Sequence, residues 1–325
     1  MNIFKTRRLM YFYSQLAAMI ESGMDILSSV NILIKHTKHN FFRVILVKIK
    51  QHLSKGETLG KTLSFFPDLF TPWQVSVVSY SEKSGKLAEG LNRIVGYFEK
   101  RQKIINNIFI ALAYPAFISQ IAIFLIPLPR LIEKGRIDYL YGVLKAAIPL
   151  YLILFIFVVI AKLIKSPGIR RFYDSFVLDV PFFGNLIKRI ELTGFIQAQK
   201  CLYDSGAPMV ENWKISSAVV GNLILKRSLA RGVSVIERGG TLNDAFASAG
   251  VFEPEIIGMV ATGVESGSIG KMLDKIVNYS ESKTDLAMGI LLKILPVVFF
   301  LAAACSVAYG IISFYAGYFS KIFPQ

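Results

Sequence analysis

The sequence has few of the residues that enzyme sites commonly use. Only 3 histidines and 2 cysteines occur among its 325 residues, which leaves little material for a metal centre, a catalytic triad or a disulfide framework. Charged residues are also scarce, at 18% of the chain, whereas 53% of the residues are hydrophobic. This apolar content excludes an intrinsically disordered chain. Together with a net charge of +15, it predicts a basic membrane protein.

Long uncharged stretches predict three transmembrane helices, because a helix needs about 20 mainly apolar residues to cross a hydrocarbon core. We expect these helices at residues 107–129, 146–164 and 291–320. Pro115 and Pro296 fall inside the first and third, where proline can kink a helix. The alternative for any one stretch is a helix buried in a protein core.

Basic residues near the predicted spans set the expected orientation. Arg101 and Lys103 precede the first span, and Lys165 and Arg170 follow the second. The N-terminus and both long polar segments are therefore expected in the cytoplasm. Residues 130–145 and the tail 321–325 would lie on the opposite side of the membrane.

The two polar segments, residues 1–106 and 165–290, are each large enough to form a domain. In the first, Leu9, Phe12 and Leu16 recur at helical spacing, and no alternation of period two predicts a strand. We therefore expect an all-α membrane protein with two cytoplasmic helical bundles. Gly23 and Gly56 stand where a left-handed residue would end a helix.

The second polar segment repeats the first. Ser22-Gly23 aligns with Ser205-Gly206, and at the same offset KGETL (55–59) aligns with RGGTL (238–242). After a one-residue deletion, Ser84-Gly85 aligns with Ser266-Gly267. Each copy precedes a predicted span that contains a proline. The repeating unit is therefore a helical domain followed by a membrane helix.

Charge differs between the two copies. Residues 1–106 contain 16 Lys plus Arg and 7 Asp plus Glu, a net charge of +9, whereas residues 165–290 contain 14 and 13, a net charge of +1. The first domain is therefore expected to face anionic lipid or an acidic partner. Its candidate basic surface is Lys48, Lys50 and Lys55. No nucleic-acid recognition motif accompanies this charge, so no nucleic-acid partner is expected.

The doubled pattern resembles the type II secretion system F family, which includes the inner-membrane platform proteins of type IV pili. The resemblance depends on EKSGKL (82–87), ESGSIGKML (265–273), the KGETL and RGGTL pair and the spacing of the three spans. It implies a non-enzymatic scaffold of the bacterial inner membrane that couples a cytoplasmic ATPase to polymerisation of pilin or pseudopilin subunits. It also implies adaptor proteins of the inner membrane as partners, contact with the bilayer, a homo-oligomer and periplasmic placement of residues 130–145 and 321–325.

The repeated turns are the candidate partner-binding positions. They comprise Gly23, Gly56, Glu82, Gly85 and Lys86 in the first copy, and Gly206, Gly239, Glu265, Gly267 and Lys271 in the second. The carboxylates of Glu82 and Glu265 could contact helix N-terminal amides or a basic partner, and both alternatives stay open.

Three groups of residues resemble chemical sites only in part. Residues 56–62 approach a phosphate-binding loop but are one residue short of it. His36 and His39 are three residues apart on a possible helix, without further ligands. Cys201 and Cys305 fall in different predicted regions, so no disulfide is expected. We therefore predict no catalysis, cofactor or metal. The alternative function is a small three-span transporter or channel subunit.

Overall fold

The computed structural model describes residues 3–37, 39–125, 127–128, 131, 135–163, 167–180 and 183–322. Every extended regular element within these ranges is an α-helix, and no strand occurs among them. The all-α prediction is therefore confirmed for the described part of the chain.

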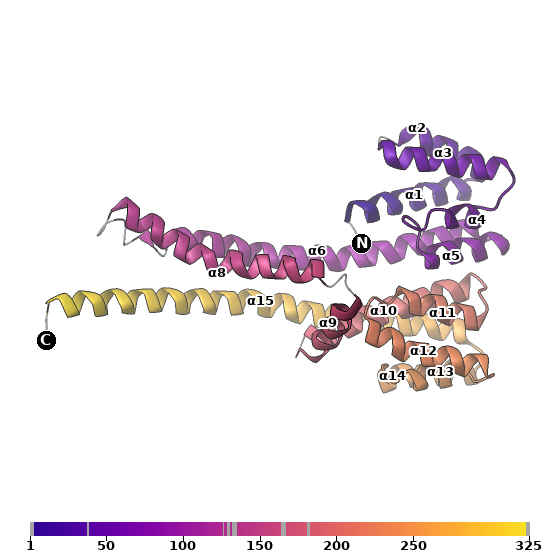
Figure 1. The fold of residues 1–325 in the computed structure, drawn as a ribbon. Coiled ribbons are helices and arrows are strands. Elements are labelled where there is room, and N and C mark those ends of the chain that lie inside the picture. The colour runs from indigo at the N-terminus through magenta and orange to yellow at the C-terminus, as the bar shows by residue number, and fades with distance from the viewer. Residues whose placement is uncertain are drawn as a thin grey trace. The chain divides into compact units, whose positions relative to one another are not determined.

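The first copy of the repeat forms an antiparallel set of helices (Figure 1). Its helices are α1 (Ile3–Glu21), α2 (Ile26–His36), α3 (Asn40–Ser54), α4 (Leu59–Ser64), α5 (Pro72–Lys83) and the beginning of α6 (Leu87–Leu125). Leu9, Phe12 and Leu16 of α1 are almost fully buried in one apolar core. The helical periodicity of the sequence therefore corresponds to the buried face of α1.

The second copy follows the same order of elements. After α9 (Pro167–Asp179), its helices are α10 (Phe183–Asp204), α11 (Met209–Val219), α12 (Leu223–Glu237), α13 (Leu242–Ala249), α14 (Pro254–Glu265) and the beginning of α15 (Ile269–Ile322). A second apolar core contains Phe195, Trp213 and Phe246. The internal repeat is thus present in the fold as well as in the sequence.

Matching residues begin matching helices. Thr58 precedes α4 and accepts a hydrogen bond from the Lys61 N–H at 3.3 Å, and Thr241 precedes α13 and accepts one from the Asp244 N–H at 3.2 Å. The hydroxyl of Thr241 also donates to the Asp244 carboxylate, which lowers the pKa of that carboxyl. Because helix N-terminal N–H groups lack partners within their own helix, these hydroxyls stabilise both helix starts.

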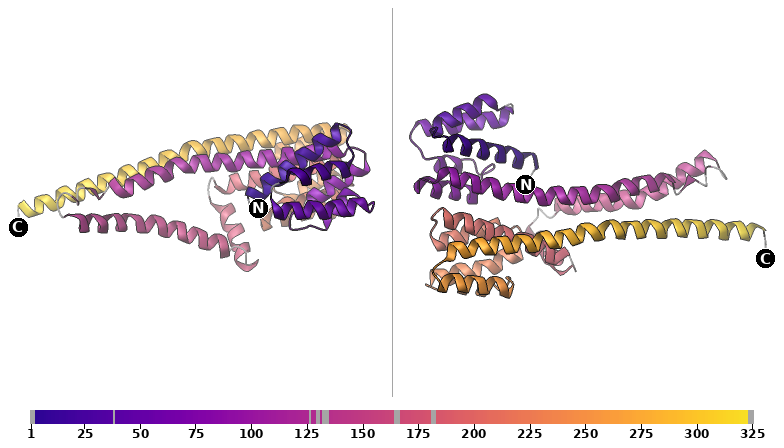
Figure 2. Two further views of the ribbon diagram at one scale, coloured as in Figure 1. Left: turned by 90° about the horizontal axis from the view of Figure 1, so that it is seen from above. Right: turned by 180° about the vertical axis from the view of Figure 1, so that it is seen from behind.

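The chain divides into two compact units. Unit 1 is Met1–Gln102 with Asp174–Thr284, and unit 2 is Lys103–Tyr173 with Asp285–Gln325. Both copies of the repeat therefore belong to one unit, whereas the sequence treats residues 1–106 and 165–290 as two domains. Within unit 1, Lys100 in the fourth turn of α6 pairs with Glu281 in the fourth turn of α15, and both helices can be followed in Figure 2.

Unit 2 contains α8 (Arg136–Leu163) and the later parts of α6 and α15. The predicted spans at 107–129, 146–164 and 291–320 each include residues or side chains outside the described part. Within what is described, no helix combines the length and apolar character needed to cross a membrane. Pro115 and Pro296 lie within α6 and α15 respectively, and neither proline ends its helix.

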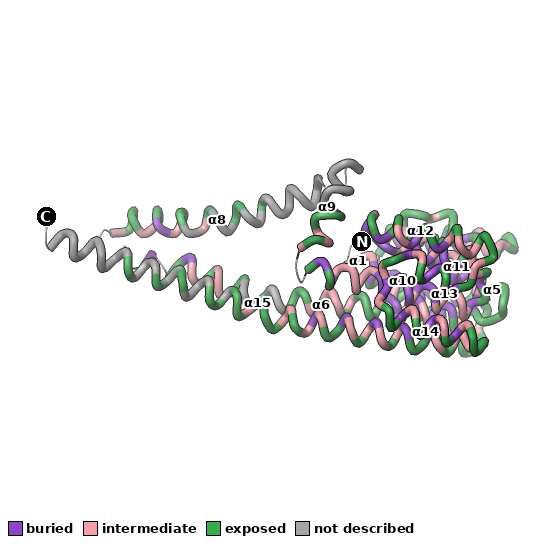
Figure 3. The backbone as a smooth tube through the Cα atoms, turned by 90° about the horizontal axis from the view of Figure 1, so that it is seen from below, coloured by how far each residue is buried: buried purple, intermediate pink, exposed green. Residues whose placement is uncertain are grey.

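Burial differs along the chain. Purple, buried residues concentrate in the helices of unit 1, whereas many described residues of unit 2 are exposed (Figure 3). The exposed residues of unit 2 include large apolar side chains, namely Phe109, Phe117, Ile137, Leu144, Phe155, Leu286, Ile290, Val297 and Phe300.

Candidate functional site

Six glycine turns divide into three pairs related by the repeat. Their φ angles are +87° and +81° at Gly23 and Gly206, +81° and +83° at Gly56 and Gly239, and +70° and +64° at Gly85 and Gly267. These are left-handed conformations that side chains with a Cβ rarely adopt. The expected left-handed helix ends at Gly23 and Gly56 are therefore confirmed.

The hydrogen bonding of these six turns is the same throughout. In each, the glycine N–H donates to the carbonyl three residues earlier, and the next N–H donates to the carbonyl five residues earlier. At Gly85, for example, the acceptors are the carbonyls of Glu82 and Ser81, at 3.2 and 2.8 Å. This arrangement satisfies carbonyls that would otherwise lack partners at a helix end.

The turns of each copy gather at the end of its bundle where α6 or α15 begins (Figure 1). Side-chain contacts connect them: Asn92 Nδ2 of α6 donates to Glu21 Oε1 beside the first turn at 2.6 Å, and Ser81 Oγ donates to Ser205 Oγ at 3.0 Å. Lys86 and Lys271 are exposed at this end. The structure thus brings the sequence-predicted turns of both copies together on one face of unit 1, which we call the turn face.

Glu82 caps a helix that is distant from it in sequence. Its Oε1 accepts the Leu59 N–H at 2.8 Å and its Oε2 accepts the Gly60 N–H at 3.0 Å, both at the N-terminus of α4. A carboxylate is favourable there because the helix dipole and the free N–H groups attract negative charge. Of the two alternatives for Glu82, the structure therefore shows contact with helix amides.

This contact explains the resemblance of residues 56–62 to a phosphate-binding loop. The backbone N–H groups of Leu59 and Gly60, which would face a phosphate, are bound to Glu82. The Lys61 ammonium pairs with Glu57 at 3.1 Å, and Glu57 also contacts His52 Nδ1 at 2.7 Å. The His52 and Lys61 contacts lower the Glu57 pKa. The anion at this helix N-terminus is part of the protein itself.

Glu265 does not reproduce the role of Glu82. The repeat offset aligns Glu82 with Val264, so Glu265 is one position later, at the last residue of α14. Its side chain is exposed. The two turns correspond, but the two carboxylates differ in position by one residue, which is enough to turn the side chains towards different directions on their helices.

The two copies meet through apolar residues of α10 that enter the first core. Ala198 and Leu202 are fully buried there, and Ala207 after the helix belongs to the same core. Cys201 packs against the same core, and burial raises the pKa of its thiol to about 12. The thiol is therefore protonated near neutral pH. Cys201 and Cys305 are both free, as the sequence predicts.

Polar contacts surround this apolar interface. Tyr80 OH of α5 donates to Glu211 of α11, and Arg93 Nε of α6 lies 3.5 Å from Asp204 Oδ2 of α10. Burial, reinforced by Glu211, raises the pKa of Tyr80 to about 12. Sequence reasoning did not identify these four residues, because a repeat shows which positions correspond but not which surfaces meet.

The predicted basic surface lies on α3 and the turn after it. Lys48 and Lys55 are exposed, whereas Lys50 is half-buried and donates to Asn31 Oδ1 of α2 at 2.8 Å. The side chains of Lys48 and Lys55 are therefore exposed on this surface, whereas that of Lys50 is bound to Asn31.

The histidine pair does not share a helix. α2 ends at His36, and His39 precedes α3 as its N-cap residue. The two imidazoles therefore do not lie on a common helical face, and both stand at helix ends. No group of three or more His, Cys, Asp or Glu close enough to hold a metal ion occurs within the described ranges.

Comparisons with known proteins relate both copies to one family. A family model described as type II secretion system (T2SS), protein F, matches residues 12–132 and 196–317. A type II secretion system protein F of Vibrio cholerae serotype O1 is 24% identical over 85% of this chain and 74% of the relative. Two type IV pilus assembly proteins PilC are also similar. That of Pseudomonas aeruginosa is 24% identical over 85% of this chain and 80% of the relative. That of Thermus thermophilus is 29% identical over 86% of this chain and 74% of the relative.

Proposed function

Because the chain belongs to the type II secretion system protein F family, we propose that it is a platform protein of the bacterial inner membrane. It couples a cytoplasmic assembly ATPase to polymerisation of pilin or pseudopilin subunits. The observation that carries this proposal is the family match to both copies of the repeat, including the turn face. The three relatives named above are called secretion or pilus assembly proteins, and none of these names supports the transporter alternative.

The proposed platform is anchored by spans at 107–129, 146–164 and 291–320. The exposed large apolar side chains of unit 2 support this placement, since lipid accommodates such side chains and water does not. With the N-terminus in the cytoplasm, unit 1 lies there as well, and residues 130–145 and 321–325 lie in the periplasm. Pilin or pseudopilin subunits then approach the platform through the membrane.

The proposed platform catalyses no reaction and requires a separate motor. Glu82 supports this view, because it holds the N–H groups that a bound nucleotide would need. The machine therefore obtains its energy from an ATPase that binds the platform. Inner-membrane adaptor proteins and further copies of the chain complete the proposed assembly.

We assign partner binding to the turn face. Lys86 and Lys271 are exposed on it, one from each copy, and are suited to acidic groups of the ATPase or an adaptor. The +9 net charge of residues 1–106, including exposed Lys48 and Lys55, favours anionic lipid or an acidic partner nearby.

Reversing charge at the turn face tests this assignment. The double variant Lys86→Glu/Lys271→Glu is expected to reduce pilus assembly or secretion by about tenfold or more, because like charges opposed at an interface cost several kcal/mol. The measurement is the amount of surface pilin or secreted substrate in cells that express the variant.

The matched control is Lys226→Glu, an exposed lysine in the first turn of α12, far along that helix from the turn at Gly239. All three substituted lysines are on the surface, so stability should change by no more than about 0.5 kcal/mol. Normal assembly by the double variant, at normal membrane levels, would remove partner binding from the turn face.

A further inference from the structure

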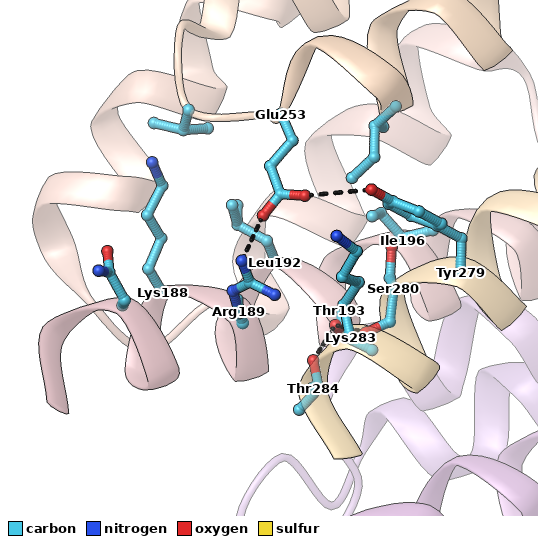
Figure 4. A pocket seen from close by; sticks show the side chains of 13 residues that line it. Lys188, Arg189, Leu192, Thr193, Ile196, Glu253, Tyr279, Ser280, Lys283 and Thr284 are labelled. Atoms are coloured by element: carbon cyan, nitrogen blue, oxygen red, sulfur yellow. Dashed lines mark hydrogen bonds and ion pairs between the residues drawn. The ribbon is translucent and has the colours of Figure 1, made fainter. Parts of the chain in front are cut away.

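A pocket of about 170 Å³ opens in the second copy of the repeat, among the beginning of α10, the segment before α14 and the third and fourth turns of α15 (Figure 4). One water molecule takes up about 30 Å³ in the liquid, so the pocket has room for a small polyatomic group. Its polar lining includes Lys188, Arg189, Thr193, Glu253, Ser280 and Lys283.

The pocket carries an excess of positive charge. Arg189 Nη2 pairs with Glu253 Oε1 at 2.9 Å, and Glu253 Oε2 also accepts from Tyr279 OH at 3.4 Å. The one lining carboxylate is therefore neutralised by the protein. Lys188 and Lys283 have no acidic partner among the described residues, and Lys283 Nζ lies 5.3 Å from the centroid of the Tyr279 ring. Both ammonium groups are thus available to anions, that of Lys283 on the side of Ser280 and that of Lys188 on the other side of the Arg189–Glu253 pair (Figure 4).

A buried hydroxyl in the lining lacks a partner. Ser280 is only 6% exposed, and its Oγ makes no hydrogen bond, whereas the neighbouring hydroxyls of Thr193 and Thr284 contact each other at 3.0 Å. A buried polar group without a partner destabilises the folded state, at a cost in free energy. A ligand oxygen that accepts from Ser280 would offset this cost.

The first copy of the repeat differs from the second at the buried hydroxyl, although the same offsets align Lys188 with Lys5 and Lys283 with Arg101, which are also basic. The repeat offset aligns Ser280 with Phe98, which is fully buried, and Thr193 with Met10. An aromatic ring thus fills the first copy where the second has an unpaired hydroxyl. The second copy therefore buries a polar group where the first copy buries an apolar one, and burial of a polar group without a hydrogen bond is unfavourable.

We propose that this pocket binds the phosphate of an anionic phospholipid headgroup. Ammonium, guanidinium and hydroxyl groups together provide the donors that phosphate oxygens accept. Apolar Leu192, Ile196 and Ile256 also line the pocket. These side chains suit the glycerol and acyl parts of a lipid. This proposal depends on the membrane location proposed above in one respect: that location identifies a lipid as the source of the phosphate.

Lipid binding by the purified full-length chain in neutral detergent tests the proposal. The probes are short-chain phosphatidylglycerol, phosphatidylcholine of the same chain length, and inorganic phosphate, with affinity measured by thermal stabilisation at increasing concentration. We expect phosphatidylglycerol to bind and Lys283→Gln to weaken it by about tenfold, as the loss of a charge-assisted hydrogen bond implies.

Two further variants keep the result interpretable. Lys226→Gln removes an exposed lysine of α12 and should leave the affinity unchanged. Ser280→Phe places the residue of the first copy in the pocket and should abolish binding. Equal binding of phosphatidylcholine, equal loss in Lys283→Gln and Lys226→Gln, or inorganic phosphate binding as tightly as the lipid would each overturn the proposal. Because the assay needs no ATPase or pilin, these outcomes are independent of the platform function.

Discussion

Trp213→Ala is expected to lower the free energy of unfolding of unit 1 by about 3–5 kcal/mol, because removal of a large buried side chain leaves a cavity. The Trp213 ring is fully buried, lies 5.0 Å from the rings of both Phe195 and Phe246, and donates through Nε1 to the Leu229 carbonyl at 2.7 Å. The substitution therefore removes two aromatic contacts and leaves a buried carbonyl without this donor.

The matched control is Val30→Ala in the first copy. Val30 is the residue that the repeat offset aligns with Trp213, and it is also fully buried. It loses only two methyl groups, so the expected cost is about 2 kcal/mol. Denaturant unfolding of both variants, followed by the helical circular dichroism signal, gives the comparison. Equal costs would contradict the prediction that the Trp213 ring stabilises unit 1 more than the Val30 side chain does.

Glu82→Gln is expected to destabilise unit 1 by about 1.5–3 kcal/mol, the usual worth of hydrogen bonds to a charged group. The carboxylate accepts from both Leu59 N–H and Gly60 N–H. A glutamine amide has one acceptor oxygen and turns its NH₂ group towards the other N–H. The change also removes the negative charge at the start of α4.

Glu265→Gln is the control for this prediction, because Glu265 has the same chemistry on the corresponding helix but is exposed. We expect a change of no more than about 0.5 kcal/mol. Both free energies come from denaturant unfolding of the full-length variants under the same conditions. If the two substitutions cost the same, the Glu82 carboxylate does not stabilise α4 in the way that its geometry indicates.

Local features of this fold were accessible from the sequence. Gly23 and Gly56 were predicted as left-handed helix ends, and the alignment of Gly85 with Gly267 predicted turns that the structure shows with the same hydrogen bonds. Such features depend on a few neighbouring residues and on the chemistry of glycine. Helical periodicity likewise identified the buried face of α1.

Features that depend on distant residues were not accessible. The offset aligns Tyr80 with Thr262, but nothing in either residue indicates that Tyr80 meets Glu211. Contact with helix amides was one of the two alternatives for Glu82, yet the amides that it binds belong to α4, earlier in the chain. α5 and α14 begin and end at corresponding residues, but Glu265 stands one position later in α14 than Glu82 does in α5, so the two carboxylates have different roles.

The pocket could not be predicted from the sequence for a different reason. Net charge was averaged over residues 165–290, where 14 basic residues are nearly balanced by 13 acidic ones. The average hides the local excess that Lys188 and Lys283 create. Comparison of Ser280 with Phe98 across the repeat could have indicated the site, since a hydroxyl at an aromatic core position is unusual.

The central claim is that the turn face of unit 1 receives the assembly machinery. The most direct test places a photoreactive residue at Lys86 or at Lys271, irradiates intact membranes and identifies the captured proteins, with Lys226 as the control position. The proposed platform predicts capture of the ATPase, its adaptor or a pilin from the turn face and none of them from Lys226. Capture of none of them from either turn, or the same proteins at the same yield from Lys226, would contradict it.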